Sequence, residues 1–314
     1  TGEIKVTKTT VGNINVSGIT FNLRGTSDSG RDIDIPAVTD ENGVAIFSEI
    51  PIGTYTIYED EKTVPTAYLV ADPQNVTVTY AETKEVPIEN KEKTGSITVH
   101  KTTEGQKNIE GIKFYLRGTS DSGRAIDIPA TTDKDGIAKF DGVPIGTYMV
   151  IEDEETVPYG YLVADEKEVK VEYAQTIDET ILNNEQTGTV KVHKKTADMT
   201  NVEGIRFILS GISDTGREIR IEATTDKDGL AKFEGVPVGT YTITEDGSTV
   251  PYGYLVADSK QVTVAYAQTV DTDMVNEKAP DTPNTGVTDN DSDGSKALCS
   301  VAIILAGAAI VMFS

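Results

Sequence analysis

The sequence predicts an all-β protein of three tandem immunoglobulin-like β-sandwich domains, followed by a C-terminal transmembrane or sorting helix. The main observation is an internal repeat with a period of 93 residues, which carries Thr1-Gly2 to Thr94-Gly95 and again to Thr187-Gly188. A period of this length is one small domain, because the units of solenoid proteins are about 20–50 residues long. Hydrophobic residues alternate within short segments between turn signals, and no window of helical periodicity precedes residue 297. Both patterns are typical of β-sandwiches.

The repeat sets the expected domain boundaries. We expect domains at 1–93, 94–186 and 187–279, a linker with a sorting motif at 280–296, and a hydrophobic membrane segment at 297–314. The last segment carries no charge and reaches the length of a membrane span. The chain starts at Thr1 with neither Met nor a signal peptide, so we expect an upstream part to be missing.

The second repeat shows the expected strands most clearly. Residues 96–101 alternate, so that Val99 and Lys101 share one face and His100 lies on the other. Asp135-Gly136 is a strong signal for a tight turn between two alternating segments. Further strands are expected, in order, at 112–116, 126–128, 148–152, 161–163, 169–171 and 180–183.

The composition limits the classes of function. The only cysteine, Cys299, lies in the apolar C-terminal run, so the repeats can form no disulfide and hold no cysteine-based site. A net charge of −23 without a basic stripe argues against nucleic acid as a partner. His100 and His193 occupy equivalent outward positions, and Thr7 replaces them in the first repeat. The sequence therefore predicts no metal, no cofactor and no enzyme that acts on an external substrate.

In each repeat, three polar side chains alternate with hydrophobic ones and so are expected to face the core. They are Lys8, Glu59 and Asn90 in the first repeat, Lys101, Glu152 and Asn183 in the second, and Lys194, Glu245 and Asn276 in the third. A charged group points inward only if it is paired or neutralised, because burying it alone is costly. The simpler interpretation is a buried Lys–Glu salt bridge capped by the Asn amide, which gives no particular reason for the Asn.

A reaction among the three side chains gives each of them a role. Desolvation lowers the pKa of a buried amine and raises that of a buried carboxyl group, so a Lys–Glu pair can exchange its proton and become neutral. The neutral amine is a nucleophile, and the Asn side chain offers an amide carbon. A protonated Glu can hydrogen-bond the amide oxygen and assist proton transfer. Attack and loss of ammonia would leave a Lys–Asn isopeptide bond, a single-turnover self-modification with Glu in the catalytic role.

The order and spacing of these residues resemble the Cna-B/SpaA-type prealbumin-like domains of Gram-positive surface proteins. The resemblance covers residues 1–279 and includes a Val-Pro-Tyr-Gly-Tyr stretch after the Glu, at 157–161 and 250–254. It implies a prealbumin-like sandwich and an isopeptide bond in each repeat. Two features depart from the family: Val precedes the proline where Ala is usual, and the first repeat reads Pro65-Thr66-Ala67-Tyr68 without the Gly. We therefore expect the first repeat to bond less completely than the others.

A short motif precedes the polar spacer and the apolar run. It consists of Thr282, Pro283, Asn284, Thr285 and Gly286. The motif resembles the Leu-Pro-x-Thr-Gly signal read by sortases, with Thr282 in place of Leu. The resemblance implies cleavage between Thr285 and Gly286 and covalent attachment to the cell wall, with sortase and peptidoglycan as partners. The alternative is a plain membrane anchor with a single span.

Together these features predict the structural stalk of an adhesin anchored to the cell wall and displayed at the cell surface. A host surface protein or glycan would be bound through the missing upstream region. One alternative is a pilus subunit, against which stands the lack of a Tyr-Pro-Lys pilin motif. The other is a binding module that contacts host proteins or glycans through the loop at 118–124, although such a loop is more often a solvated turn.

Overall fold

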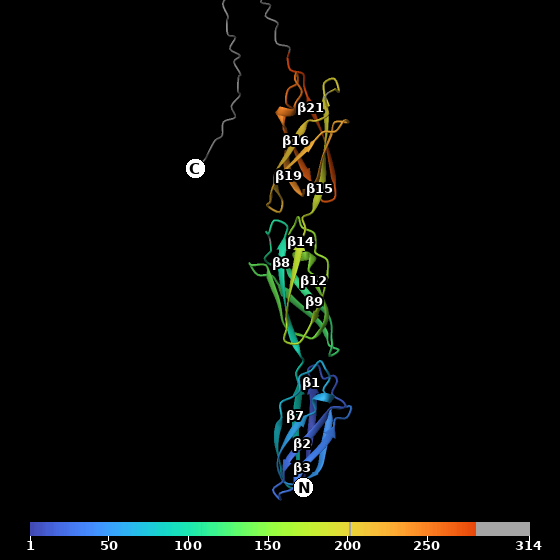
Figure 1. The fold of residues 1–314 in the computed structure, drawn as a ribbon, viewed down its shortest axis with the longest axis vertical. Coiled ribbons are helices and arrows are strands. Elements are labelled where there is room, and N and C mark those ends of the chain that lie inside the picture. The colour runs from blue at the N-terminus through green and yellow to red at the C-terminus, as the bar shows by residue number, and fades with distance from the viewer. Residues whose placement is uncertain (108, 201, 281–314) are drawn as a thin grey trace, which may run out of the picture. The chain divides into compact units, whose positions relative to one another are not determined.

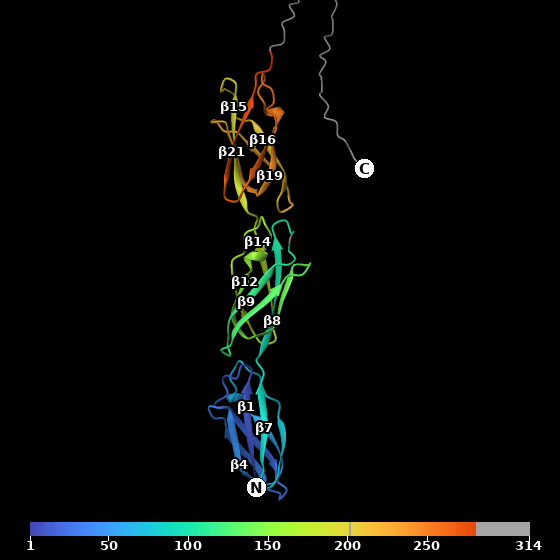
Figure 2. The same ribbon diagram turned by 180° about the vertical axis from the view of Figure 1, so that it is seen from behind.

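The computed structural model describes residues 1–107, 109–200 and 202–280. Within these residues the chain is all-β, and each repeat folds as a sandwich of one three-stranded and one four-stranded sheet (Figures 1 and 2). Each sandwich encloses its own hydrophobic core. The predicted fold of three tandem β-sandwiches is confirmed.

The three repeats have the same order of elements. The first contains β1 (Gly2–Thr10), β2 (Thr20–Thr26), β3 (Asp32–Val38), β4 (Val44–Ile50), β5 (Gly53–Glu59), the 3₁₀-helix η1 (Glu61–Thr63), β6 (Gln74–Val78) and β7 (Thr83–Asn90). The second contains β8 (Thr94–Thr103), β9 (Lys113–Ser120), β10 (Ala125–Thr131), β11 (Ile137–Pro144), β12 (Gly146–Glu152), η2 (Glu154–Thr156), β13 (Lys167–Val171) and β14 (Thr176–Asn183). The third contains β15 (Thr187–Thr196), β16 (Arg206–Ser213), β17 (Glu218–Thr224), β18 (Leu230–Pro237), β19 (Gly239–Glu245), η3 (Gly247–Thr249), β20 (Lys260–Val264) and β21 (Thr269–Asn276).

The first and last strands of each repeat are neighbours in the three-stranded sheet. In the first repeat, β1 pairs antiparallel with β4 on one side and parallel with β7 on the other. The parallel register sets Lys8 opposite Ile88 and Thr10 opposite Asn90. The side chains of Lys8 and Asn90 therefore lie on adjacent strands, one pleat apart, although they come from opposite ends of the repeat.

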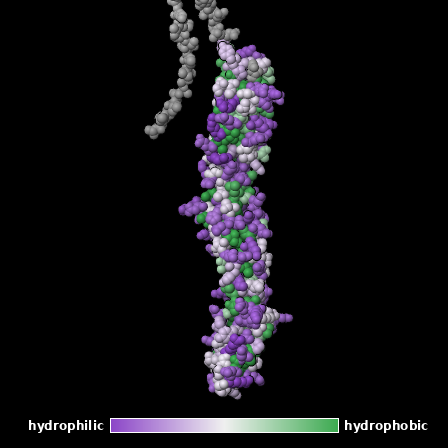
Figure 3. Space-filling model, viewed as in Figure 1, coloured by the Kyte–Doolittle hydropathy of each residue, from purple (hydrophilic) through white to green (hydrophobic). Residues whose placement is uncertain are grey.

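Strand alternation fills the core between the two sheets. Ile97 and Val99 of β8 are fully buried and lie in one cluster with Phe114 and Leu116 of β9. Burying an aliphatic or aromatic side chain of this size contributes roughly 1.5–3 kcal/mol. On the outside, Figure 3 shows hydrophilic residues over most of the visible face, with hydrophobic ones only in small groups.

The tight turn predicted at Asp135-Gly136 lies between β10 and β11 and helps to fix Lys101. Gly136 has a φ of +75°, and a Cβ there would lie 2.7 Å from the carbonyl oxygen of Lys101. The carbonyl oxygen of Gly136 accepts a 2.7 Å hydrogen bond from the Lys101 amide. Only glycine combines this backbone conformation with so close an approach to the strand.

The strand prediction was wrong at one place in the second repeat and incomplete at another. Residues 161–163 form no strand, and only Tyr161 and Glu185 make an isolated bridge. The reason is that Leu162 has other partners: its amide donates to Asn184, and its carbonyl oxygen accepts from the Asn183 side chain. The prediction also gave no bounds for β11, which follows directly after the Gly136 turn.

The predicted sorting motif and hydrophobic segment, from Thr282 onward, lie outside the described residues. Among the residues that the structure does describe, none belongs to a helix of the length and hydrophobicity that crossing a membrane requires.

Candidate functional site

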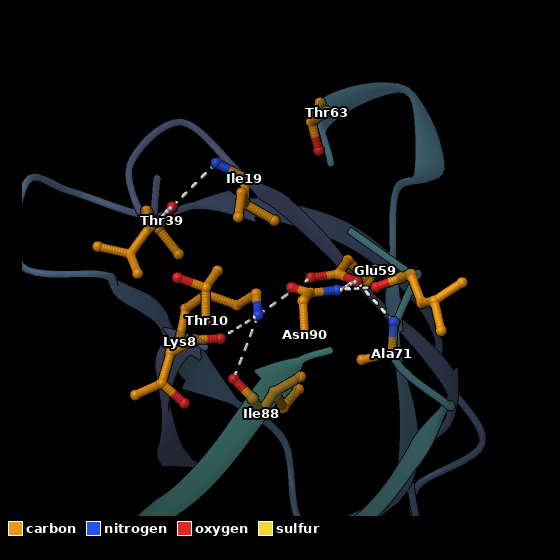
Figure 4. Close-up of polar contacts among 12 residues, drawn as sticks. Lys8, Thr10, Ile19, Thr39, Glu59, Thr63, Ala71, Ile88 and Asn90 are labelled. Atoms are coloured by element: carbon orange, nitrogen blue, oxygen red, sulfur yellow. Dashed lines mark hydrogen bonds and ion pairs between the residues drawn. The ribbon is translucent and has the colours of Figure 1, made fainter. Parts of the chain in front are cut away.

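Each sandwich holds a Lys, a Glu and an Asn on its inner faces, as the alternation predicted. In the first repeat, Lys8 comes from β1, Glu59 from the end of β5 and Asn90 from the end of β7. Figure 4 shows the three side chains pointing toward one another. The side chains of Lys8 and Glu59 are 0% and 1% exposed, and Asn90 is fully buried. Three polar groups thus share a site from which water is excluded.

The carboxylate of the Glu lies between the other two side chains. The distance from the Lys Nζ to Glu Oε1 is 3.7 Å in the first and second repeats and 3.4 Å in the third. The distance from the Asn Nδ2 to Glu Oε2 is 2.6, 2.6 and 2.5 Å in the same order. One carboxyl group therefore contacts both the amine and the amide, and the altered Pro65–Tyr68 loop leaves this geometry unchanged in the first repeat.

Backbone groups hold the carboxylate and the amide in place. In the second repeat, the Ala164 amide donates to Glu152 Oε2 at 2.8 Å. The Asn183 side chain donates one hydrogen bond to Glu152 and another, at 2.6 Å, to the carbonyl oxygen of Leu162. Because both amide hydrogens have partners, the orientation of the Asn183 carboxamide is fixed. Sequence reasoning missed these backbone partners, since their contribution depends on chain path and not on side-chain type.

Two oxygens of the site lack hydrogen bonds in every repeat. They are the Asn Oδ1 and the Glu Oε1, which are buried and find no hydrogen-bond partner among the described residues. Buried polar atoms of this kind are rare, because each costs about 1–3 kcal/mol. Each repeat therefore keeps two buried oxygens that can still accept a hydrogen bond.

Burial favours the neutral form of the Lys amine in each repeat. Lys101 Nζ donates to the carbonyl oxygens of Thr102 at 2.6 Å and Ile181 at 3.1 Å. Burial lowers the pKa of Lys101 to about 8, against the opposing influence of Glu152. Burial likewise lowers the pKa of Lys8 and of Lys194. With a pKa of about 8, about a tenth of the Lys101 amines are neutral at pH 7, and a neutral amine is nucleophilic.

The arrangement can support acyl transfer from the Asn amide to the Lys amine. Nζ would attack the Asn Cγ, and the C–N bond to the leaving nitrogen would break. The protonated Glu would stabilise the developing charge on Oδ1, deliver its proton to Nδ2, which leaves as ammonia, and take up in exchange the proton that Nζ loses. The alternative for such a buried pair is a salt bridge, which accounts for the contact between the Lys Nζ and Glu Oε1 but gives the Asn Oδ1 no partner.

The structure also shows polar contacts that the sequence reasoning missed. The loop at 118–124, interpreted as a solvated turn or a host-binding surface, carries Ser122 and Arg124, which contact Glu92. A comparison of the repeats could have pointed to this contact. Glu92 of the first repeat corresponds to Glu185 of the second, whereas the third repeat has Lys278 at this position. No group of three or more His, Cys, Asp or Glu side chains within the described ranges could hold a metal ion.

Known proteins match the chain in family and in fold. The family model for the SpaA prealbumin-like fold domain matches residues 2–92, 95–186 and 188–278. No curated protein matches the chain. Among solved structures, the Bacillus anthracis TIE protein is 20% identical with a TM-score of 0.63, over 88% of this chain and 50% of that one. The chain therefore spans half the length of that structure.

Two pilin structures match with lower TM-scores. The major pilin subunit BcpA of Bacillus cereus is 16% identical with a TM-score of 0.42, over 88% of this chain and 99% of that one. A streptococcal ancillary pilin is 18% identical with a TM-score of 0.36, over the same shares. The family model accounts for nearly all of Thr1–Lys278. The chain belongs to the SpaA prealbumin-like fold domain family and contains three of these domains in tandem.

Proposed function

We propose that each repeat joins its Lys to its Asn through an isopeptide bond that it forms itself, with the buried Glu as the acid–base group. The observation that carries the proposal is the Glu carboxylate between the amine and the amide in all three repeats, with Oε1 beside the Lys Nζ, Oε2 beside the Asn Nδ2, and the Asn Oδ1 free of hydrogen bonds. The bond pairs are Lys8–Asn90, Lys101–Asn183 and Lys194–Asn276. Glu59, Glu152 and Glu245 assist them.

The function that follows is mechanical. A bond between β1 and β7 would carry load from the first strand directly to the last and would exclude residues 9–89 from it. It would also close a loop of about 80 residues, which by analogy with disulfides contributes on the order of 4 kcal/mol to stability. Such domains suit the structural stalk of a surface adhesin, and the repeats lack the cysteines that a disulfide cross-link would need.

The anchoring part of the proposal rests on the sequence at 282–286. A sortase would cleave after Thr285 and attach the protein to peptidoglycan. Before this cleavage, the apolar segment would retain the protein in the membrane. We favour a stalk over a pilus subunit because the chain lacks a Tyr-Pro-Lys pilin motif.

The intact mass of the recombinant protein tests the central claim. Three bonds would lower the mass by three molecules of ammonia relative to the sequence. A folded protein with the unmodified mass would leave the buried salt bridge as the correct interpretation.

A further inference from the structure

A buried carboxylate joins the first repeat to the second. Glu92 follows Asn90 by two residues, and its side chain is only 5% exposed. Arg124 donates to it twice, from Nη2 to Oε2 at 2.7 Å and from Nε to Oε1 at 3.3 Å, and the Ser122 hydroxyl donates to Oε1. A bidentate contact between an arginine and a carboxylate fixes the relative orientation of the two side chains and pairs their charges.

The same contact recurs between the second and third repeats. Glu185 is 0% exposed in its side chain and accepts hydrogen bonds from Thr215 and from Nη2 of Arg217. We call the receiving residues of each repeat the socket. It comprises Ser120, Ser122 and Arg124 in the second repeat and Ser213, Thr215 and Arg217 in the third.

Backbone pairing accompanies each occupied socket. The amide of Ile145 donates to the carbonyl oxygen of Lys93 at 3.0 Å, and the amide of Val238 donates to that of Gln186 at 3.0 Å. We call the residues after the last strand of each repeat its tail, which is 91–93 in the first repeat and 184–186 in the second. Lys93 and Gln186 directly follow the buried Glu of their tails. The tail of one repeat therefore docks on the next through one carboxylate and one main-chain hydrogen bond.

The first repeat has the same socket, made of Ser27, Ser29 and Arg31. The Arg31 amide donates to Ser27 Oγ at 3.0 Å, as the Arg124 amide donates to Ser120 Oγ at 3.1 Å, so the loop has the same conformation. Here, however, Ser29 and Arg31 are exposed, whereas Ser122 is buried.

The residue whose amide would donate a hydrogen bond to an incoming tail is also exposed. Ile52 corresponds to Val238 and is 44% exposed, against 1% for Val238. Its amide makes no hydrogen bond within the described part of the chain. With Ser29 and Pro51 it lines a shallow cavity at this end of the repeat.

The third repeat cannot supply the missing carboxylate from the same position. Lys278 stands where Glu92 and Glu185 stand in the other tails. Its Nζ lies 3.4 Å from Asp198 Oδ2 of the same repeat. A lysine facing Arg31 would repel it, so the socket disfavours a tail of this third type.

We propose that the end face of the first repeat, formed by Ser29, Arg31 and Ile52, is a docking site for the tail of another SpaA-type repeat placed directly before it. That tail carries a Glu two residues after its Asn. The Glu carboxylate contacts Arg31 and Ser29, and the next carbonyl oxygen accepts from the Ile52 amide. The occupant is a repeat of the first or second type, since the third type lacks the carboxylate.

Amide hydrogen exchange in a four-repeat protein tests this inference. A copy of residues 94–186 is placed directly before Thr1 of the whole chain, which recreates the junction that precedes Thr187. We expect the Ile52 amide to exchange about tenfold more slowly than in the original chain, because it becomes hydrogen-bonded and covered. The Ile145 and Val238 amides of the original repeats provide internal references for an occupied socket.

Two matched variants make the test specific to the carboxylate. Replacing the added copy of Glu185 with Lys, as at Lys278, should return Ile52 to fast exchange, and so should Arg31→Gln. Equal protection of Ile52 with the Glu and the Lys tails would overturn the inference.

The natural junction gives a second test if the added repeat does not fold. In the original chain, Glu185→Lys should release the Val238 amide and leave Ile145 protected. Unchanged protection of Val238 would also overturn the inference. Neither result depends on the isopeptide bonds, whose presence is read separately from the intact mass.

Discussion

Asn183 donates a 2.6 Å hydrogen bond to Glu152 Oε2, and its side-chain oxygen Oδ1 has no hydrogen-bond partner among the described residues. The other carboxylate oxygen of Glu152, Oε1, accepts no hydrogen bond and forms an ion pair with Lys101 Nζ at 3.7 Å. We propose that the isopeptide bond forms from this geometry, in which the amide is oriented and the carboxyl group lies between the amide and the amine.

Removing one Glu should block one bond and leave the others intact. In Glu152→Ala the amine and amide of the second repeat lose their shared acid–base group, so the protein should weigh one ammonia more than the bonded form after correction for the substitution. Intact mass spectrometry measures this, and peptide mapping should find the 101–183 cross-link absent and the 194–276 cross-link present. A full set of three bonds in Glu152→Ala would remove Glu152 from the mechanism.

The pH dependence of bond formation should reveal whether the acid is needed. The reactive pair consists of a neutral amine and a neutral acid. It holds the same number of titratable protons as the ion pair, so pH does not change the ratio of the two forms. Above a pH of about 8, where Lys101 loses its proton in the folded state, the pair holds no proton. The rate should therefore be flat just below pH 8 and fall about tenfold per pH unit above it.

The measurement starts from unbonded protein recovered in denaturant from inclusion bodies. Dilution into buffers of set pH starts folding, and the mass is followed after acid quenching. A rate that rises up to pH 8 and then stays constant would mean that the neutral amine reacts without a protonated Glu152.

Single-molecule pulling should show a covalent path through each repeat. Wild-type repeats should extend little, whereas Lys194→Ala should free the 81 residues from 195 to 275. At up to about 3.5 Å per residue this adds about 280 Å of contour length. Full extension of every wild-type repeat would contradict the stalk function.

Thermal unfolding of the third repeat should distinguish the effect of losing the isopeptide bond from the cost of an unpaired buried carboxylate. Lys194→Ala removes the bond and leaves Glu245 buried without a cation, whereas Asn276→Ala removes the bond and keeps the Lys–Glu pair. We expect the loss of the bond to lower the free energy of unfolding by on the order of 4 kcal/mol in both variants. Lys194→Ala should lower it by about 3–5 kcal/mol more, because Glu245 is left buried without a partner. Equal losses would show that Glu245 is neutral in the unbonded domain.

Sorting should depend on the motif at 282–286. The protein should be released from cells by peptidoglycan hydrolases and not by detergent, and replacement of Thr285 or Gly286 should move it to the membrane or the medium. Fractionation of cells that express each variant measures this. Release of the unmutated protein by detergent alone would identify the apolar segment as a plain membrane anchor.

The sequence alone determined the repeat, the β-sandwich class and the inward-facing Lys, Glu and Asn. These follow from local rules, because a strand alternates its side chains and a polar residue at a core position is visible in any one repeat. The error at residues 161–163 shows the limit of such rules. Tyr161-Leu162-Val163 has the composition of a strand, but its backbone is paired with an Asn side chain that lies 21 residues away in sequence.

Only the tertiary structure decided how the three residues meet and what the repeat ends contact. The parallel pairing of β1 with β7 brings Lys8 beside Asn90, and strand composition does not encode which strands become neighbours. The backbone groups of Ala71 and Leu69 that hold the first site are equally invisible in sequence, since every residue carries them. The loop at 118–124 was interpreted as a solvated turn or a binding surface, and the fold places its Arg124 against Glu92. A contact between separate elements depends on chain path, and the path is set by the packing of the whole domain.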